Sequence, residues 1–285
     1  MRFSNHLKQR LIDRYGPWAL VTGASSGIGK ELAERLAEAG LNMVLTGRNG
    51  EVLRDFGDAL EEKYKIIAEV IIADIASTAG IYSLIEKVCE LPIGLFVASA
   101  GFGTSGQFVH SPLEQETQML KVNALALLML THYFARRFAE QKKGGIILMS
   151  SIVGFQGVPN AAHYAATKAY VQSIGEGLHY ELKPYNVDVL AAAPGPVNSG
   201  FAAVARMELG NALKPSDIGI PILKALGRKS TVFPGRLTKI LIFGLRTVPR
   251  WGKIQIMKLV MGGMTKHQTL KKHGNGHLSI NRPKS

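Results

Sequence analysis

The chain has 285 residues, enough for one large α/β domain or two small ones, and enough to bury a self-sufficient hydrophobic core. Its formal net charge of +13 is unevenly placed, since residues 218–285 hold 14 of the 34 Lys and Arg residues and none of the 21 Asp and Glu residues. The remaining residues, 1–217, are nearly neutral. This distribution excludes a nucleic-acid-binding core and indicates a specialised C-terminal region.

The N-terminal residues 1–15 mix cations with apolar side chains and lack the continuous apolar run of a secretory signal. Their pattern predicts a short amphipathic helix. The single Cys89 cannot form an intramolecular disulfide, and the apolar run around it predicts a packed, inert thiol. We therefore expect a reducing, cytoplasmic compartment.

A short apolar run at residues 18–22 precedes a glycine-rich turn, and apolar residues then recur at helical spacing over 28–39. This order predicts strand, turn and helix. Gly23 allows the tight turn, Gly27 lets the backbone approach a pyrophosphate, and Gly29 permits close packing of helix on strand. The amides at the helix N-terminus are free to bind phosphate. The predicted phosphate-binding residues are Gly23, Ser25, Ser26, Gly27, Ile28 and Gly29. A turn without a ligand is the alternative.

Further apolar runs alternate with helical patterns along the chain. The runs that predict strands are 42–46, 66–73, 93–98, 145–151, 187–193 and 231–234. The almost continuous run at 66–73 is typical of a buried parallel strand. Residues 111–114 have the form of a capping box and predict a long helix that ends near Glu140. Together these elements predict an α/β fold: one doubly wound domain at 16–235, with a mainly parallel seven-stranded sheet and helices on both faces.

Tyr164 and Lys168 lie four residues apart in a segment that reads as helical, so both project from one face. An ammonium near a phenol lowers the phenol pKa and makes the hydroxyl a usable proton donor. The same pair also occurs on ordinary helix surfaces. Ser151 lies thirteen positions earlier, at the end of a predicted strand, where its hydroxyl could polarise a carbonyl. No Gly-x-Ser-x-Gly elbow surrounds Ser151, so we do not expect a nucleophile.

The motif Thr22-Gly23-Ala24-Ser25-Ser26-Gly27-Ile28-Gly29, together with Ser151 and the Tyr164–Lys168 pair, resembles the short-chain dehydrogenase/reductase family. The resemblance covers about residues 16–234 and implies a Rossmann fold that transfers a hydride between a nicotinamide cofactor and a carbonyl/alcohol pair. It implies that Ser151 positions the oxygen, Tyr164 supplies the proton, Lys168 binds the nicotinamide ribose and lowers the Tyr164 pKa, and the backbone carbonyl of Asn123 holds a water. Residues 15–21 and the long basic end look most like the branch of 3-oxoacyl-CoA and hydroxysteroid reductases.

The resemblance also bears on the cofactor. NAD-binding members place an acid after the second strand, where this chain has Gly47 followed by Arg48. A guanidinium without a neighbouring carboxylate suits a 2′-phosphate, so we predict NADP(H); a surface Arg without a ligand is the alternative. Asp74 either contacts the adenine or caps the next helix. The other implied cofactor contacts are Ser99, Ala100, Gly101, Pro194, Val197 and Ser199. Ala98 and Ser99 replace two asparagines common in the family, which puts the usual bracing between strands in doubt.

Residues 200–211 occupy the place of the family's substrate lid, and their apolar face suggests an apolar substrate. Residues 236–265 are too interrupted by charges to span a bilayer and predict two basic amphipathic helices parted by Pro249. These helices pack over the cleft or a partner subunit, or they lie on an anionic membrane surface. Residues 266–285 predict a disordered tail, and their histidines lack metal-binding spacing, so no metal is expected.

We therefore predict an NADP(H)-dependent oxidoreductase that reduces an apolar ketone, such as a 3-oxoacyl or steroid-like substrate, and forms a homodimer or homotetramer. A catalytically silent NADPH sensor or membrane-associated scaffold is the alternative, and an epimerase or dehydratase is a third possibility. His163 adjoins Tyr164, but adjacent helical residues point about 100° apart, so we assign it to support around the site or to packing.

Overall fold

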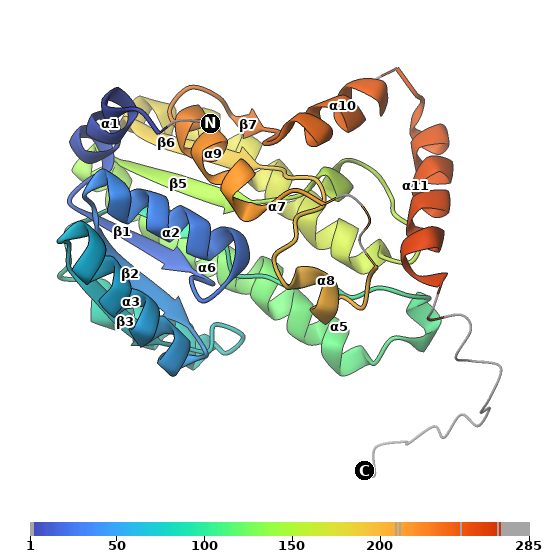
Figure 1. The fold of residues 1–285 in the computed structure, drawn as a ribbon, viewed down its shortest axis with the longest axis horizontal. Helices are drawn as coiled ribbons and strands as arrows, with labels where there is room; N and C mark the ends of the chain where they lie inside the picture. Colours follow the sequence, from blue (N-terminus) through green and yellow to red (C-terminus); the bar gives the residue numbers. More distant parts are fainter. Residues whose placement is uncertain (1–2, 209, 211, 246, 267, 269–285) are drawn as a thin grey trace, which may run out of the picture.

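Seven parallel strands form the sheet at the centre of the structure, a computed structural model that describes residues 3–208, 210, 212–245, 247–266 and 268 (Figure 1). The strands are β1 (Trp18–Thr22), β2 (Asn42–Gly47), β3 (Ala68–Ile72), β4 (Ile93–Ala98), β5 (Gly144–Met149), β6 (Val187–Ala192) and β7 (Thr231–Val232). Their order in the sheet is β3-β2-β1-β4-β5-β6-β7, and every neighbouring pair is parallel. The predicted doubly wound fold is confirmed. The chain reverses direction across the sheet between β1 and β4, the point where such sheets bind ligands.

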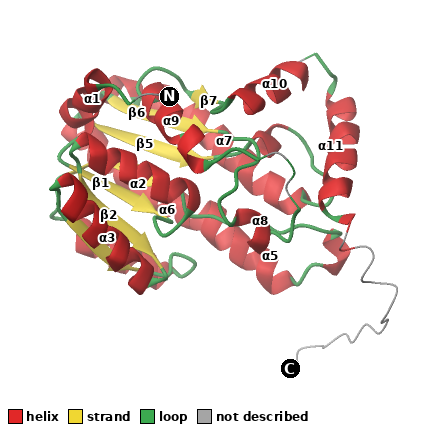
Figure 2. Ribbon diagram, viewed as in Figure 1, coloured by secondary structure: helices red, strands yellow, loops and turns green. Residues whose placement is uncertain are grey.

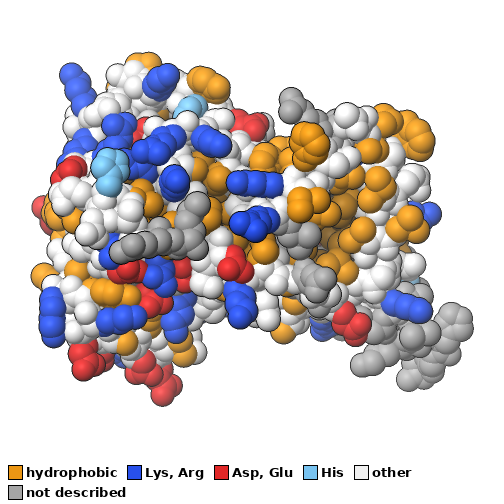
Figure 3. Space-filling view, turned by 45° about the horizontal axis from the view of Figure 1, so that its top comes forward, with side chains coloured by type: hydrophobic (Ala, Val, Ile, Leu, Met, Phe, Trp, Pro, Cys, Tyr) orange, Lys and Arg blue, Asp and Glu red, His pale blue; other side chains and the backbone are white. Residues whose placement is uncertain are grey.

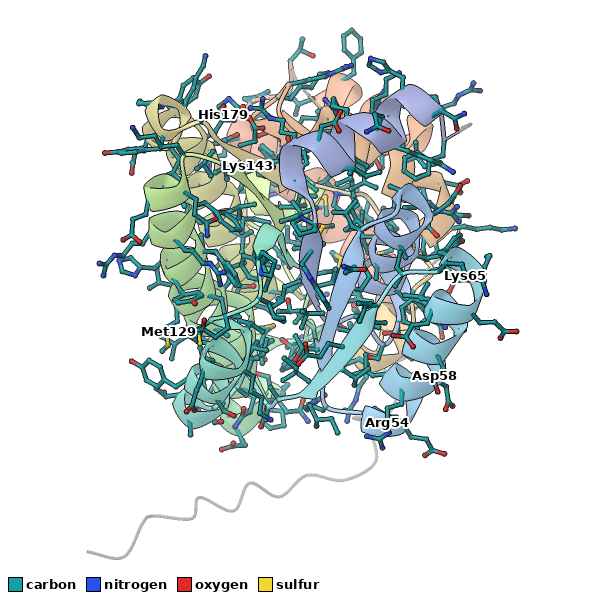
Figure 4. The ribbon with its side chains drawn as sticks, turned by 90° about the vertical axis from the view of Figure 1, so that its left-hand side faces the viewer. Arg54, Asp58, Lys65, Met129, Lys143 and His179 are labelled. Carbon is teal, nitrogen blue, oxygen red and sulfur yellow. The ribbon has the colours of Figure 1, made fainter. Side chains whose placement is uncertain are left out.

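Helices cover both faces of this sheet (Figure 2). Those on the first face are α1 (Asn5–Tyr15), α2 (Gly27–Ala39), α3 (Gly50–Tyr64) and α9 (Gly219–Ala225). Those on the second face are α4 (Thr78–Val88), α6 (Leu127–Gln141) and α7 (Ala162–Glu181). In Figure 4 the helices that carry Met129 and His179 lie on one side of the sheet, and the helix that carries Arg54 and Asp58 lies on the other.

Alternation along the buried strands builds two separate cores. Successive side chains of a strand point to opposite faces. Val21 and Val97 therefore pack beneath α2, whereas Leu20 and Phe96 pack beneath α6. All residues of β1, β4 and β5 are buried, because parallel strands in the middle of a sheet are covered on both faces.

Two local expectations are wrong. The run at 66–73 forms β3 at the edge of the sheet, where Ile72 is 50% exposed, because no strand pairs with its outer side. Cys89 is exposed and donates to the Glu86 carbonyl at 3.0 Å. It follows Val88 at the end of α4, one position past the last residue that the helix turns toward the core.

The predicted long helix runs from α5 (Leu113–Leu120) through a π-helical segment (Lys121–Ala126) into α6. The predicted capping box does not form. Pro112 is the N-cap residue, and Ser111 donates its hydroxyl to the Phe108 carbonyl at 2.8 Å. The helix is thus joined to the short 3-10 helix that precedes it.

The remaining helices, α8 (Phe201–Val204), α10 (Arg236–Leu245) and α11 (Arg250–Met264), lie beyond the carboxyl ends of the strands, and we call them the cap (Figure 1). Pro249 separates α10 from α11, as predicted. No helix within the described residues is long and apolar enough to cross a bilayer. Of the predicted disordered tail, Lys266 and Gln268 belong to the described part of the chain, and the rest lies outside it.

Candidate active site

Tyr164 and Lys168 lie side by side in α7, beyond the end of β5, and both are buried. The Lys168 ammonium lies 5.9 Å from the centre of the Tyr164 ring. It donates a hydrogen bond of 2.7 Å to the carbonyl of Met149, the last residue of β5. The predicted pair therefore shares one face of a helix, and that face is turned into the protein.

Ser151 follows β5 and meets Tyr164 from the sheet. The Ser151 hydroxyl lies close enough to the phenol to lower the pKa of Tyr164. Ser151 also begins a short 3-10 helix, whose Val153 amide lies 3.4 Å from the Ser151 hydroxyl oxygen. The neighbouring Ser150 is buried and donates to the Lys168 carbonyl at 3.0 Å, which supports the structural role expected for it.

Burial dominates the protonation of this pair. It raises the pKa of Tyr164 above its usual value, and the neighbouring Ser151 hydroxyl offsets this only in part. Burial also lowers the pKa of Lys168 to about 8. Lys168 is not among the causes of the Tyr164 pKa shift, and its ammonium donates to the Met149 carbonyl instead; the lowering of the phenol pKa by Lys168 therefore stays a prediction. Tyr164 is protonated at neutral pH.

Asn123 lies in the π-helical segment and is buried. Its amide oxygen accepts from the Phe102 amide at 3.1 Å, and its amide nitrogen donates to the Phe102 carbonyl at 2.8 Å. A further hydrogen bond of 3.1 Å reaches the Thr167 hydroxyl in α7. Asn123 therefore connects the loop after β4 to the helix that carries Tyr164. π-Helical turns occur frequently at functional sites, because they displace backbone carbonyls from the regular ladder.

The glycine-rich turn adopts the geometry that its sequence predicts. Gly23 has φ +70° and Gly27 has φ +57°, conformations that disfavour residues with a side chain. A Cβ on Gly29 would lie 2.3 Å from the Gly23 carbonyl oxygen, which accounts for glycine at this close contact. A Cβ on Gly27 would lie 2.7 Å from the Cβ of Ser199, so Gly27 also allows the nearby loop to approach.

The start of α2 is suited to a phosphate group. Ser26 is the N-cap residue, yet its side chain makes no capping hydrogen bond. The first amides of α2 are thus not satisfied by their N-cap, and the positive end of the helix dipole adds to their attraction for an anion. Ser25 lies beside Gly47, and Ile28 packs partly into the core. These residues fit the pyrophosphate of a dinucleotide.

Arg48 and Asp74 follow neighbouring strands. Arg48 is exposed and has no ion-pair partner within the described part of the chain, so its guanidinium is available to an anion. Asp74 is exposed, and its carboxylate accepts from the Ala76 amide at 3.1 Å. The cap of α4 is Ser77, which accepts from Gly80, so the capping role offered for Asp74 is wrong.

The loop formed by Ser99, Ala100 and Gly101 is braced by a residue that we did not identify from the sequence. The Thr22 hydroxyl accepts from the amides of Ser99 and Ala100, both at 3.1 Å. Thr22 thus provides a brace between β1 and β4 where the family's asparagines are missing. Its position at the end of β1, beside the end of the neighbouring strand β4, is the feature of the sequence from which this contact could have been predicted.

The loop after β6 reaches toward the site from the opposite side. The Pro194 carbonyl accepts from the Ile152 amide at 3.1 Å, and Val197 forms an isolated parallel bridge with Leu213. Ser199 lies against Gly27. The predicted binding residues on both sides of the β1–β4 junction therefore meet at the carboxyl ends of the strands.

The cap contributes apolar side chains to the site, as the lid prediction for residues 200–211 and the prediction that the two C-terminal helices pack over the cleft both imply. The Phe201 ring of α8 lies 5.2 Å from the Tyr164 ring. Met257 and Met261 of α11 are buried in the cluster that contains Tyr164 and Met119. Helical spacing marked these methionines as part of an apolar face, but only the fold shows what that face covers.

His163 lies beside the site without facing it. Its Nδ1 is 2.6 Å from a carboxylate oxygen of Glu116, a buried residue of α5. The contact joins α5 to the start of α7, in agreement with the packing role predicted for His163.

Comparison with known proteins identifies the class. The family model for short chain dehydrogenases matches residues 17–209, and the chain therefore belongs to this family. It is an oxidoreductase with the family's nicotinamide-cofactor fold, and within the family it resembles hydroxysteroid and 3-oxoacyl reductases.

Three proteins illustrate the resemblance. A 7beta-hydroxysteroid dehydrogenase of Clostridium sardiniense is 31% identical over 236 residues, 80% of this chain and 88% of the relative. The 3-oxoacyl-[acyl-carrier-protein] reductase FabG of Aquifex aeolicus is 33% identical over 196 residues, 68% of this chain and 79% of the relative. A short-chain dehydrogenase from Sphingobium yanoikuyae, solved in complex with NADPH, has 28% identity and a TM-score of 0.73, covering 81% of this chain and 94% of its own.

Proposed function

We propose that this protein reduces the carbonyl group of an apolar ketone to an alcohol with NADPH. The observation that carries the proposal is the meeting of Ser151, Tyr164 and Lys168 at the end of β5, where the Ser151 hydroxyl is close enough to act on the Tyr164 pKa and the Lys168 ammonium lies 5.9 Å from the centre of the Tyr164 ring. When bound, the reduced nicotinamide supplies the hydride.

The proposed roles follow from the chemistry of each group. Ser151 donates a hydrogen bond to the substrate oxygen and orients it toward Tyr164. Burial raises the Tyr164 pKa, so the phenol holds the proton that the new alkoxide needs. Lys168 binds the nicotinamide ribose. The Asn123 carbonyl holds a water that passes protons toward Lys168, a role supported by the π-helical turn.

A Tyr164→Phe variant tests the proposal. Removing the phenol hydroxyl deletes the proton donor and leaves the phosphate- and ribose-binding residues intact, so ketone reduction should fall by about 10²–10⁴-fold while NADPH binding is kept. NADPH oxidation across a panel of ketones measures the rate, and fluorescence titration measures binding. NADPH binding by the wild type without turnover on any ketone would instead favour the silent sensor or scaffold.

The proposed preference for NADPH rests on Gly47 and the exposed Arg48. An Arg48→Ala variant should bind NADPH about ten- to a hundredfold more weakly and NADH almost normally, because a charge-assisted hydrogen bond contributes roughly 1.5–3 kcal/mol and only NADPH carries the 2′-phosphate. Dissociation constants of both cofactors give the answer. Equal weakening of the two would assign Arg48 to folding.

The apolar substrate is supported by Phe201, Met257 and Met261 near Tyr164. A steroid-like or 3-oxoacyl compound has the required apolar surface, and the names of the two relatives point the same way. We therefore place the protein in lipid metabolism.

Partners, location and domain limits complete the proposal. We propose a cytoplasmic homodimer or homotetramer that attaches peripherally to membranes through its basic C-terminal region. In this division of the chain, residues 1–15 form an N-terminal helix, 16–235 bind cofactor and substrate, and 236–265 form the attachment helices; most of the tail at 266–285 lies outside the described residues.

A further inference from the structure

The outer side of the cap is a contiguous apolar surface. On α10, Ile240 and Phe243 are 68% and 76% exposed and lie three positions apart, on one side of the helix. On α11, Ile256, Leu259 and Val260 are exposed at spacings of three and four. Figure 3 shows hydrophobic side chains gathered at the end of the molecule where these two helices lie. Soluble monomers rarely expose so many large apolar side chains together.

The charges carried by α10 and α11 have one sign. The exposed or half-exposed cations on α10 and α11 are Arg236, Lys239, Arg250, Lys253 and Lys258. No acid follows Asp217 anywhere in the sequence. An exposed Trp251 lies among the cations. A second copy of the same face would bring like charges together, whereas an anionic lipid surface is complementary in both charge and polarity.

The inner side of the same two helices reaches the active site. In α10, the hydroxyl of the buried Thr238 accepts from the Gly195 amide at 3.0 Å, in the loop that precedes Ser199. In α11, Met257 and Met261 pack in the cluster that contains Tyr164. Each helix thus has one side toward solvent and the other toward the reacting groups.

Hydrogen bonds join the end of α11 and the residues after it to the segment that follows α8 and to Ser105, in the loop after β4. The Glu208 amide donates to the Met264 carbonyl at 3.0 Å. The Gln268 side chain donates to the Arg206 carbonyl at 2.6 Å and to the Ser105 hydroxyl at 2.9 Å. We call these three contacts the latch. Phe201 of α8 lies 5.2 Å from Tyr164 between ring centres, so the latch connects α11 to the segment that carries Phe201.

Building on the proposed function, we propose that an anionic lipid bilayer docks on the outer side of α10 and α11, and that docking moves the latched cap so that bilayer-dissolved ketones pass directly to Tyr164. Contact with lipid would stabilise Phe243 and Leu259 in an apolar environment. Any displacement of α11 is passed to α8 through the latch and opens the space above Tyr164.

The test compares full-length protein with vesicles of phosphatidylcholine alone and of phosphatidylcholine with phosphatidylserine. Anionic vesicles should raise kcat/KM for a long-chain ketone dissolved in them by about tenfold or more, and added salt should remove the gain by screening. A short water-soluble ketone, assayed without vesicles, measures the basal reaction. If basal reduction occurs but anionic vesicles change nothing, the docking inference fails and the proposed function stands.

A double charge reversal on α11 tests docking, and a matched double reversal outside the cap is its control. Lys253→Glu with Lys258→Glu should weaken vesicle co-sedimentation by at least about tenfold, because each cation near an anionic surface contributes about 1 kcal/mol. Lys87→Glu with Lys183→Glu, a matched pair of exposed lysines outside the cap, should leave co-sedimentation nearly unchanged. If both double variants lost vesicle co-sedimentation equally, the binding would depend on the net charge of the protein and not on the position of the lysines in the cap, and the docking inference would fail.

Gln268→Ala with Ser105→Ala removes part of the latch. This variant should co-sediment with vesicles normally and keep basal turnover. The ratio of kcat/KM with anionic vesicles to kcat/KM without them should fall toward one. A full gain would overturn the coupling. The alternative occupant of this surface is a second copy of the chain, and light scattering tests it by measuring the oligomeric state of a Phe243→Ser, Leu259→Ser variant. If this variant dissociates from an oligomer and still binds vesicles, a second copy occupies the surface and the membrane inference is wrong.

Discussion

The sheet and the cap of this molecule differ in how closely their residues are packed. In the sheet, every residue of β1 and β4 is buried, and a Cβ on Gly29 would lie 2.3 Å from a backbone oxygen. In the cap, Phe243 is 76% exposed, and a Cβ on Gly263 would meet nothing within 4 Å among the described residues. The cofactor side of the site is therefore held by close packing, whereas the substrate side is held by a few contacts along one side of each helix.

A large effect that we expect in this comparison comes from the buried Lys168. Its pKa is lowered from 10.5 to about 8, so between these values the unfolded chain holds a proton that the folded protein has lost. The free energy of unfolding should therefore rise with pH, by about 2 kcal/mol between pH 8 and about pH 9.5. Urea unfolding without added cofactor, at several pH values, measures this rise.

A Lys168→Met variant is the control, because it removes the titrating group and keeps the side-chain volume. The other ionisable groups titrate in both proteins, so the difference between the two pH curves isolates Lys168. Parallel curves would show that Lys168 is hydrated in solution and that the packing around it is looser than in the structure.

A matched pair of glycine substitutions measures the difference in tolerance directly. Gly29→Ala should destabilise the protein by about 1–3 kcal/mol, because the added methyl group meets the Gly23 carbonyl oxygen and something must shift. Gly263→Ala adds the same methyl group near the end of α11, where it meets open space, and should stabilise by up to about 1 kcal/mol through helix propensity. Urea midpoints give both values; a loss from Gly263→Ala as large as that from Gly29→Ala would remove the distinction.

The smallest effect concerns the contact that crosses from cap to sheet. Thr238→Val keeps the shape of the side chain and removes the acceptor for the Gly195 amide, so we expect a loss of about 1 kcal/mol in stability and weaker cofactor binding. Thermal unfolding with and without NADPH separates the two losses. Loss of stability alone would limit Thr238 to anchoring α10.

Motif spacing was sufficient for much of the site. The glycines at 23, 27 and 29 could be predicted because few residues allow the backbone to turn and approach so closely, and Gly23 and Gly27 do have positive φ. The four-residue spacing of Tyr164 and Lys168 placed both on one helical face, because helix geometry is local. Their surroundings were not local. The pKa of Tyr164 is raised because its side chain is buried, which the spacing could not reveal.

The sequence by itself determined the alternation of strands and helices, the parallel sheet, the glycine-rich turn and the two helices parted by Pro249, since each depends on periodicity or on residues with restricted backbone angles. Only the tertiary structure decided that β3 lies at the edge, that the Thr22 hydroxyl braces the loop after β4, and that Met257 and Met261 pack in one cluster with Tyr164. These features depend on contacts between residues distant in the chain. An apolar stripe on a helix indicates that one side is buried, and only the folded molecule shows which residues it packs against.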